Sequence, residues 1–426
     1  MSHDVTRRNF VQRAAGTALA AAPAVLPALG ANGRVTAGWI GTGSRGNYLM
    51  NMAFEGAPEM FEIAAVCDTY DGHRNRAKDL VQTKTQKTPK TFVDYRDVLK
   101  EPSIQAVVIA TPEHLHYTMA MDALQAGKHI YLEKPLAHTI EEGEEIVALA
   151  AKAGKVVQVG TQNRSNSLYI KAKEMFEQGL IGKIHYVRAF WYRNSLNDNP
   201  AWRYAIPPDA SPQNTDWKRF LGPAGDRPFN KQRYYQWRLY WDYSSGISTD
   251  LLVHQTDITN FVVGQTVPLS CMASGGIYRW VSEDDDREVP DTLSAIYEYP
   301  GRFHVNYSCY FGNDHFGYGE QFMGNEGTIE VLNRQTLNFY PESFRGKPPA
   351  HIAARKPVNI ELPGNDNKAV QAHLRNWLEA IQGKAELVAP PKVGQQAAIS
   401  GHIATLSFRS GKKVIWDDVA RRYHFA

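Results

Sequence analysis

Short continuous apolar runs alternate with amphipathic segments over residues 32–160. The runs, which have the length of buried strands, occupy residues 35–40, 61–67, 106–110, 129–132 and 156–159. The amphipathic segments, which we expect to be helices, include residues 48–54, 117–126 and 140–153. Strands that alternate with helices are typical of a doubly wound parallel sheet, the α/β Rossmann architecture. Ligands bind such a sheet at the C-terminal ends of its strands.

The pattern changes after residue 160. Expected helices cover 167–177, 250–261, 370–382 and 394–408, and expected strands cover 184–192, 269–278, 292–299, 302–310, 321–324, 328–332 and 336–340. Turn sequences at Pro300-Gly301 and Asn325-Glu326-Gly327 favour antiparallel pairing. We therefore predict a C-terminal α+β domain, residues 161–426, with a large, mostly antiparallel open sheet. Residues 193–243 have no clear period and many aromatic side chains, so we predict a loop or lid there.

The first 31 residues have a different character. Arg7 and Arg8 precede Phe10 and an alanine-rich run at 14–29 that is too short and too weakly apolar for a comfortable membrane span. The twin arginines resemble the signal for the twin-arginine (Tat) export machinery, with cleavage near residues 28–31. The alternative is a disordered tail with a chance arginine pair. We expect export to the periplasm or beyond, with a cofactor held tightly enough to travel with the folded protein.

The amino-acid composition argues against several classes of binding partner. The formal net charge is +3 over 426 residues and is spread out, so neither nucleic acid nor an anionic membrane is expected. Cys67, Cys271 and Cys309 lie far apart, without metal-binding spacing or a disulfide framework. No metal is expected.

Gly41, Gly43 and Gly46 follow the first apolar run with G-x-G-x-x-G spacing. Between a strand and a helix this spacing predicts a dinucleotide site. The first glycine permits the tight turn, the second lets the backbone approach a pyrophosphate, and the third lets the helix pack against the strand. Ser44 and Arg45 lie in the same turn, where the helix N-terminus offers N–H groups to phosphates.

Asp68 ends the second run, about 20 residues beyond the glycines, where a carboxylate accepts hydrogen bonds from the ribose hydroxyls of NAD. This carboxylate would repel the 2′-phosphate of NADP, so NAD is the expected cofactor. Arg74 and Arg76 lie just downstream and could hold a phosphate, which keeps NADP as the less favoured alternative.

Polar residues follow the later strands of the predicted sheet. Those expected to line the cofactor site are Thr111, Pro112, His116, Glu133, Lys134 and Gln162. Lys134 lies at a strand end, beside Glu133 and before Pro135, which restricts its backbone to extended geometry. Its ammonium can orient a substrate hydroxyl and stabilise an alkoxide that forms on it. The alternative is a surface glutamate–lysine pair of little energetic value.

Asp250, His254 and Asp257 share one face of an expected helix, because their spacing is i, i+4 and i+7. One interpretation is a general base, since an acid one turn from a histidine can raise its basicity and fix its tautomer. A metal site and a solvated polar face are the other interpretations. We favour the base, because consecutive positions on one helix give awkward metal geometry.

Taken together, Gly41–Gly46, Thr111-Pro112 with His116, and 126–129 leading into Glu133-Lys134-Pro135 resemble the glucose-fructose oxidoreductase / inositol dehydrogenase / MocA (Gfo/Idh/MocA) family. The resemblance covers essentially the whole chain after the N-terminal segment. It implies an NAD(P)-binding Rossmann domain followed by an α+β domain. It also implies that Lys134 contacts both the nicotinamide side and the substrate.

The resemblance extends to the second domain. Gly246-x-x-x-Asp250-x-x-x-His254 matches the second signature of the family, whose acid and histidine line the substrate pocket opposite the nicotinamide. Further candidate substrate contacts are Arg164, Arg238, Asp242 and Asp257. In the family the open face of the sheet packs in oligomers, so a homodimer or homotetramer is expected.

We therefore predict an exported oxidoreductase that acts on a carbohydrate: a sugar, a sugar acid or a glycoside. His254, with Asp250, takes the hydroxyl proton and Lys134 steadies the oxygen, while hydride passes to the nicotinamide. Two alternatives stay open. Some relatives in the family are NAD-dependent glycosidases, which oxidise the sugar, eliminate the glycosidic group and reduce the ketone back. The other alternative is a non-catalytic sugar-binding protein that kept the fold.

Overall fold

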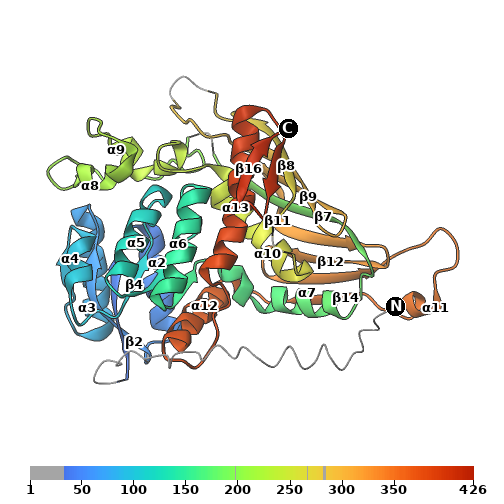
Figure 1. Ribbon diagram of the computed structural model, residues 1–426, viewed down its shortest axis with the longest axis horizontal. Coiled ribbons are helices and arrows are strands. Elements are labelled where there is room, and N and C mark those ends of the chain that lie inside the picture. The colour runs from blue at the N-terminus through green and yellow to red at the C-terminus, as the bar shows by residue number, and fades with distance from the viewer. Residues whose placement is uncertain (1–32, 197, 266, 282–284) are drawn as a thin grey trace, which may run out of the picture.

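The computed structural model describes residues 33–196, 198–265, 267–281 and 285–426. It contains two sheets, and helix α13 (Pro391–Ser410) lies between them (Figure 1). The predicted signal peptide, residues 1–31, lies outside the described residues. Within the described ranges, no helix has both the length and the apolar character needed to cross a membrane.

The first sheet is the predicted parallel Rossmann sheet, with strand order β3-β2-β1-β4-β5-β6. Its strands are β1 (Val35–Ile40), β2 (Phe61–Cys67), β3 (Lys90–Phe92), β4 (Ala106–Ile109), β5 (His129–Leu132) and β6 (Val157–Val159). The main helices between them are α2 (Ser44–Gly56), α3 (Asp71–Thr85), α4 (Tyr95–Lys100), α5 (His116–Gln125) and α6 (Ile140–Ala153). Every residue of β1, β4 and β5 is buried, because an apolar cluster packs on each face of the sheet. This double burial explains the uninterrupted apolar runs.

The second sheet has ten strands in the order β14-β13-β12-β11-β7-β10-β9-β8-β15-β16. All neighbours are antiparallel except β7 and β10. The strands are β7 (Ile184–Asn194), β8 (Ser270–Gly276), β9 (Thr292–Tyr299), β10 (Phe303–Tyr310), β11 (Gly312–Gly324), β12 (Gly327–Leu332), β13 (Thr336–Pro341), β14 (Val358–Glu361), β15 (Val414–Asp417) and β16 (Arg422–Phe425). The predicted strands are present, although β11 begins well before residue 321. Strands β14 to β16 were not predicted, because four-residue segments carry too little periodicity.

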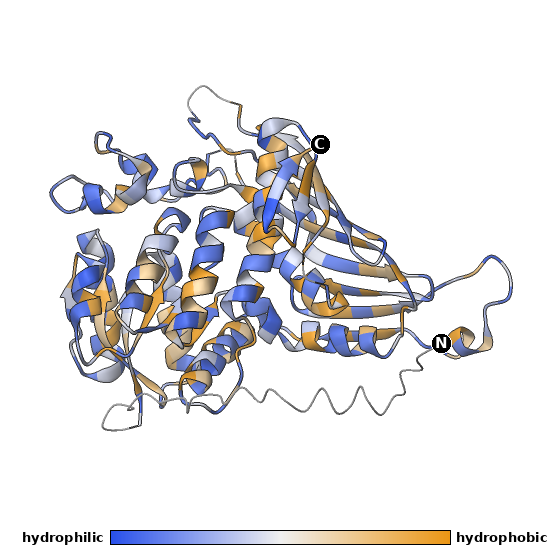
Figure 2. Ribbon diagram, in the orientation of Figure 1, coloured by the Kyte–Doolittle hydropathy of each residue, from blue (hydrophilic) through white to orange (hydrophobic). Residues whose placement is uncertain are grey.

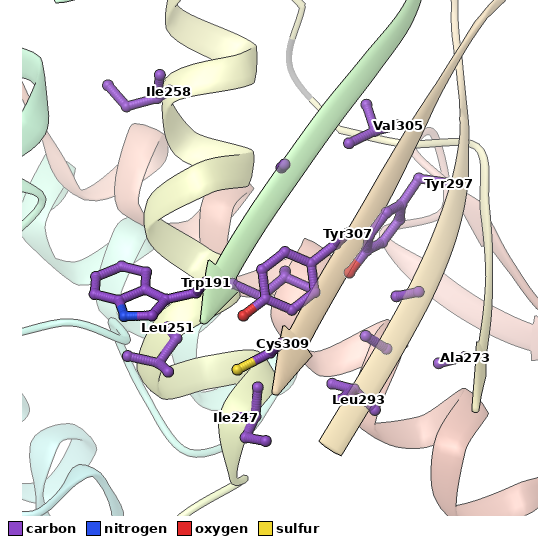
Figure 3. Packing of buried hydrophobic residues seen from close by; sticks show 14 of the residues in the cluster. Trp191, Ile247, Leu251, Ile258, Ala273, Leu293, Tyr297, Val305, Tyr307 and Cys309 are labelled. Carbon is purple, nitrogen blue, oxygen red and sulfur yellow. The ribbon is translucent and has the colours of Figure 1, made fainter. Parts of the chain in front are cut away.

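The core of the second domain lies between this sheet and helices α7 (Ser167–Glu177), α10 (Val253–Val263) and α13. Figure 3 shows part of this core, with Tyr297, Val305 and Tyr307 on the strands and Ile258 on the helical side. Figure 2 shows that hydrophobic residues gather where the helices face the two sheets.

Helix α12 (Asn365–Ile381) packs back on the first domain. Its Leu374 and Trp377 join Trp39 and Tyr131 in the apolar cluster on one face of the Rossmann sheet. This contact brings the C-terminal part of the chain against its N-terminal part, and the local pattern of either segment does not indicate it.

Residues 198–243, which we call the strap, are largely irregular and include α8 (Trp217–Leu221) and α9 (Lys231–Tyr235). The strap crosses from the second domain to the first. Thr215 forms a β-bridge with Tyr70, and the Asp71 amide donates to the Asn214 carbonyl at 3.0 Å. Figure 1 shows α8 and α9 beyond the ends of α4 and α5. The predicted loop is therefore an ordered bridge between the domains.

Candidate active site

A cavity of about 1070 Å³ lies between the two domains and the strap. The Rossmann domain contributes the turns that follow β1, β2, β4 and β5, where the strand pattern predicts a ligand. The second domain contributes polar and aromatic side chains, among them Trp191, Arg193, Arg238, Asp250, His254 and Arg334.

The glycine turn fits a dinucleotide. Gly41 has φ +82°, and a Cβ there would lie 2.8 Å from the Ala110 carbonyl. A Cβ on Gly46 would overlap the carbonyl oxygen of Gly41, so only glycine lets α2 lie this close to the turn. A Cβ on Gly43 would lie 3.6 Å from the His73 ring, an ordinary van der Waals contact, and Gly43 lines the cavity together with Ser44 and Arg45. The turn and the N-terminus of α2 can therefore cradle a pyrophosphate.

Asp68 lies at the end of β2, on the cavity wall, and is only 8% exposed. Its carboxylate accepts hydrogen bonds from the amides of Thr42 (2.7 Å) and Tyr70 (3.0 Å) and from the hydroxyl of Tyr234 (3.2 Å). Burial acts to raise the pKa of Asp68, but His73 and the two amide donors outweigh it and lower that pKa overall. The carboxylate is therefore ionised at the position where ribose hydroxyls are expected.

Arg45, Glu133 and Gln162 form one network on the cavity wall. The Arg45 guanidinium lies 2.7 Å from the Glu133 carboxylate and donates to the Gln162 amide oxygen at 3.3 Å. Burial acts to lower the pKa of Arg45, but the Glu133 charge outweighs it and raises that pKa. The structure brings these three predicted residues together, and Glu133 offsets the Arg45 charge.

Lys134 follows β5 and reaches across to the second domain. Its Nζ donates to the Asp250 carboxylate (2.9 Å) and to the Asp250 carbonyl (2.6 Å). The Nε of Arg238 donates to the same carboxylate oxygen at 3.1 Å. Burial acts to raise the pKa of Asp250, but Lys134 and Arg238 outweigh it and hold that pKa well below its usual value. Because an ammonium carries three protons, Lys134 keeps one for a substrate oxygen.

Asp250 belongs to a short π-helix, Ser248–Leu252, and the α-helix begins only at Val253. Such turns are frequent at functional sites. Glu113, beyond the end of β4, accepts hydrogen bonds from the Ser245 amide and the Thr249 hydroxyl. These bonds hold the π-helix against the Rossmann domain. Glu113 is a functional residue that the sequence analysis missed, since nothing local distinguishes it from other loop acids.

His254 lies one turn beyond Asp250 and lines the cavity, but no hydrogen bond joins the two among the described residues. Its Nδ1 is buried without a partner in the described part of the chain. Burial, and then the Lys134 charge, push the pKa of His254 well below its usual range. Asp250 acts to raise the pKa of His254, as expected, but burial and the Lys134 charge outweigh it, and the carboxylate is bonded to Lys134 and Arg238 rather than to the imidazole. The imidazole is neutral and can still accept a proton.

Arg164 and Asp257 do not reach the cavity, which corrects their assignment as substrate contacts. The Arg164 Nε donates to both carboxylate oxygens of Asp257, at 2.8 and 3.0 Å. The Asp257 side chain is 1% exposed. The pair joins the turn after β6 to the middle of α10, so it fixes that helix next to the end of the Rossmann sheet.

Asp242 and His116 are also corrected, since neither lines the cavity. Asp242 pairs with Arg233 at 3.0 Å within the second domain. The two ring nitrogens of His116 lie 2.8 Å from the Pro135 carbonyl oxygen and 3.0 Å from the Thr111 carbonyl oxygen, and the N–H of the ring donates to one of them. His116 therefore ties together two loops whose ends form the cavity wall. Within the described ranges, no group of three or more histidine, cysteine or acidic side chains has the arrangement of a metal site.

Trp191, Arg193 and Arg334 line the second-domain wall, and the sequence analysis did not single them out. The guanidinium groups of Arg193 and Arg334 lie 5.1 and 5.0 Å from the centre of the Trp191 ring. That ring lies 5.9 Å from the His254 ring, centre to centre, and Figure 3 shows it beside Leu251. Trp191 and Arg193 are two residues apart on β7, so strand periodicity is the pattern that could have paired them.

Models of one protein family match both domains. The model described as "Oxidoreductase family, NAD-binding Rossmann fold" of the Gfo/Idh/MocA group matches residues 35–161. Two models described as "Oxidoreductase family, C-terminal alpha/beta domain" match residues 226–415 and 173–274.

Two curated proteins are similar to parts of this chain. The inositol 2-dehydrogenase/D-chiro-inositol 3-dehydrogenase of Lactiplantibacillus plantarum is 33% identical over 29% of this chain and 34% of its own length. The alpha-N-acetylgalactosaminidase of Shewanella oneidensis is 28% identical over 47% of this chain and 50% of its own length. The chain thus spans about a third to a half of the curated relatives that it matches.

A solved levoglucosan dehydrogenase, in complex with NADH and levoglucosan, superposes on 90% of this chain and 99% of its own. The TM-score is 0.67 and the sequence identity is 19%. At this identity the likeness shows a shared two-domain fold.

Proposed function

Since the chain belongs to the Gfo/Idh/MocA oxidoreductase family, we propose that it is an NAD(P)-dependent oxidoreductase acting on a CH–OH group of a sugar, a sugar acid or a glycoside. One observation carries the proposal. Lys134 of the Rossmann domain pairs with Asp250 of the second domain, which Arg238 also binds, beside His254 on the wall of a cavity that the glycine turn also lines.

The chain's own groups handle the alcohol. When bound, the nicotinamide supplies hydride acceptance or donation. His254 takes the hydroxyl proton on Nε2, because Nδ1 is the buried nitrogen. The remaining N–H of Lys134 stabilises the alkoxide that develops, while Asp250, which is itself held by Arg238, keeps the ammonium in position.

We infer that the cofactor is NAD and that it is held tightly. The ionised Asp68 supports NAD, and Arg74 is bonded to Asp71 at 2.5 Å rather than free to bind a 2′-phosphate. Arg76 lines the cavity and is the residue that would favour NADP. The strap supports tight binding, because Tyr234 bonds to both Asp68 and Thr69 at the end of β2.

Export and assembly are further proposals. Tat export to the periplasm rests on Arg7 and Arg8, and the N-terminal sequence of the protein recovered from a periplasmic fraction tests it. A homodimer or homotetramer rests on an exposed sheet face whose large apolar side chains include Met272, Ile296, Tyr310, Met323 and Tyr340. Light scattering on the purified protein tests it.

A second candidate function is NAD-dependent glycoside hydrolysis through transient oxidation, elimination and re-reduction. The likeness to the alpha-N-acetylgalactosaminidase favours it, and so does the strap, whose Tyr234 bonds to Asp68 where it would enclose a bound cofactor. Aryl glycosides incubated without added cofactor distinguish the two. Release of the phenol without net NADH would contradict the simple dehydrogenase. Sugar binding without any turnover would instead favour a non-catalytic carbohydrate-binding protein.

The first experiment is mass spectrometry of the cofactor released from denatured protein, followed by a sugar panel monitored by nicotinamide absorbance. We expect NAD and a substrate-dependent change in its redox state. NADP in the denatured supernatant would contradict our interpretation of Asp68.

A further inference from the structure

We propose that the substrate carries a carboxylate, and that Arg193 binds this carboxylate at the second-domain end of the cavity. The inference rests on the proposed function, because it names the class of sugar, a sugar acid such as a hexuronate, that the same site accepts. It assigns a specificity role to a residue outside the reacting group of Lys134, Asp250 and His254.

Arg193 differs from the other arginines of this end. Arg238 is paired with Asp250 at 3.1 Å, and Arg334 is paired with Asp366 at 3.1 Å. Arg193 is half-buried on the cavity wall and has no carboxylate partner among the described residues. A half-buried guanidinium without an acid is the group that a ligand carboxylate can pair with, through two parallel hydrogen bonds.

The charge balance around the reacting group points the same way. Lys134 and Arg238 share the single carboxylate of Asp250. With Arg193 and the neighbouring Glu113 carboxylate included, three cations face two anions on this wall. An oxidised nicotinamide would bring a further positive charge to this end. Because charges in a partly dry cavity interact more strongly than in water, an anionic substrate binds there better than a neutral one of the same shape.

The indole of Trp191 sets the position of the carboxylate. Its ring lies 5.1 Å from the Arg193 guanidinium and 5.9 Å from the His254 ring. A sugar ring laid along this edge presents one hydroxyl to His254 and Lys134 and its far substituent to Arg193. The carboxylate is therefore remote from the carbon that loses hydride, and it serves recognition rather than chemistry.

The test is equilibrium binding of sugars to the purified, cofactor-loaded protein, monitored by tryptophan fluorescence and calorimetry. The probes are matched sets: D-glucuronate, D-glucose and D-glucose 6-phosphate, and the corresponding galactose series. We expect at least one acid to bind about 10- to 100-fold more tightly than its neutral and phosphorylated partners. Arg193→Gln should reduce this preference by a similar factor, and Arg193→Lys should restore part of it. Arg188→Gln on the same strand, outside the cavity wall, should leave the preference unchanged.

An unchanged preference in Arg193→Gln, a stronger affinity for the phosphates, or no preference for any acid would overturn the inference. The outcomes also separate it from the proposed function. Arg193-dependent binding of an acid without redox turnover would contradict only the proposed reaction. Oxidation of neutral sugars with no preference for acids would contradict only the carboxylate site.

Discussion

Two ion pairs connect the ends of Rossmann strands to the same helical segment of the second domain. Lys134 pairs with Asp250 at 2.9 Å, and Arg164 pairs with Asp257 at 2.8 Å. In each pair the cation follows a Rossmann strand and the acid lies on the segment from the π-helix through α10. Their surroundings differ. Asp250 lies on the cavity wall and has a second cation, Arg238, whereas Asp257 is away from the cavity and has only Arg164 among the described residues.

The difference appears in how the two acids titrate. The two cations lower the pKa of Asp250 despite its burial. Burial raises the pKa of Asp257, and the single Arg164 offsets this only in part. The same two residue types therefore make a charged site in one place and a buried structural pair in the other. Access to the cavity, and not the residue types, separates the two roles.

The largest effect is expected from Asp257→Asn. This change leaves Arg164 buried without a counter-charge, which should lower the free energy of unfolding by about 3–5 kcal/mol. Chemical denaturation measures it. Turnover per folded molecule should stay near wild type, because the pair is away from the cavity. The double variant Arg164→Met/Asp257→Leu is the control and should recover most of the stability. A stable Asp257→Asn protein with lost turnover would show that this pair belongs to the active site.

For Lys134→Met we expect a large loss of turnover with little change in stability. Turnover should fall about 10²–10³-fold, because one oriented donor to the developing alkoxide is removed. Stability should change little, since Asp250 keeps Arg238 as a partner. Single-turnover reduction of the bound cofactor measures the loss of turnover. Denaturant titration measures the change in stability. Normal turnover would contradict the assignment of Lys134.

The pH dependence of turnover tests whether His254 is neutral in the active site. Because burial and Lys134 depress the pKa of His254, the imidazole stays neutral as the pH falls through about 6.5, the ordinary histidine pKa. The ability of His254 to accept the hydroxyl proton, and with it kcat/KM for alcohol oxidation, should therefore persist below this pH and decline only in more acid solution. A half-maximal rate near 6.5 that disappears in His254→Gln would contradict the depressed pKa.

The smallest effect is expected at the strap. Tyr234→Phe removes the hydroxyl that bonds to Asp68 and Thr69, and should speed cofactor release about 5- to 10-fold. Displacement of bound NADH by excess NAD, followed by fluorescence, measures the rate. Tyr240→Phe is the matched control, because that hydroxyl bonds to Asp286 within the second domain. Equal rates of cofactor release in the two variants would show that the strap does not help to retain the cofactor.

The sequence by itself was enough to predict the Rossmann sheet, the strand-rich second domain and the cavity position of Gly41, Asp68, Lys134 and His254. These predictions rest on local rules, since apolar periodicity sets strands and helices and parallel strands end at one edge of a sheet. Export, which rests on residues 1–31, stays a prediction.

Only the tertiary structure decided which of the polar residues face the cavity. A helical spacing places Asp250, His254 and Asp257 on one face, but it cannot say where the cavity ends along that face. Tertiary packing pairs Asp250 with Lys134 and Arg238, and it pairs Asp257 with Arg164. Trp191, Arg193 and the strap reach the site through contacts between residues far apart in the chain. Such contacts depend on how whole domains dock, which no local pattern encodes.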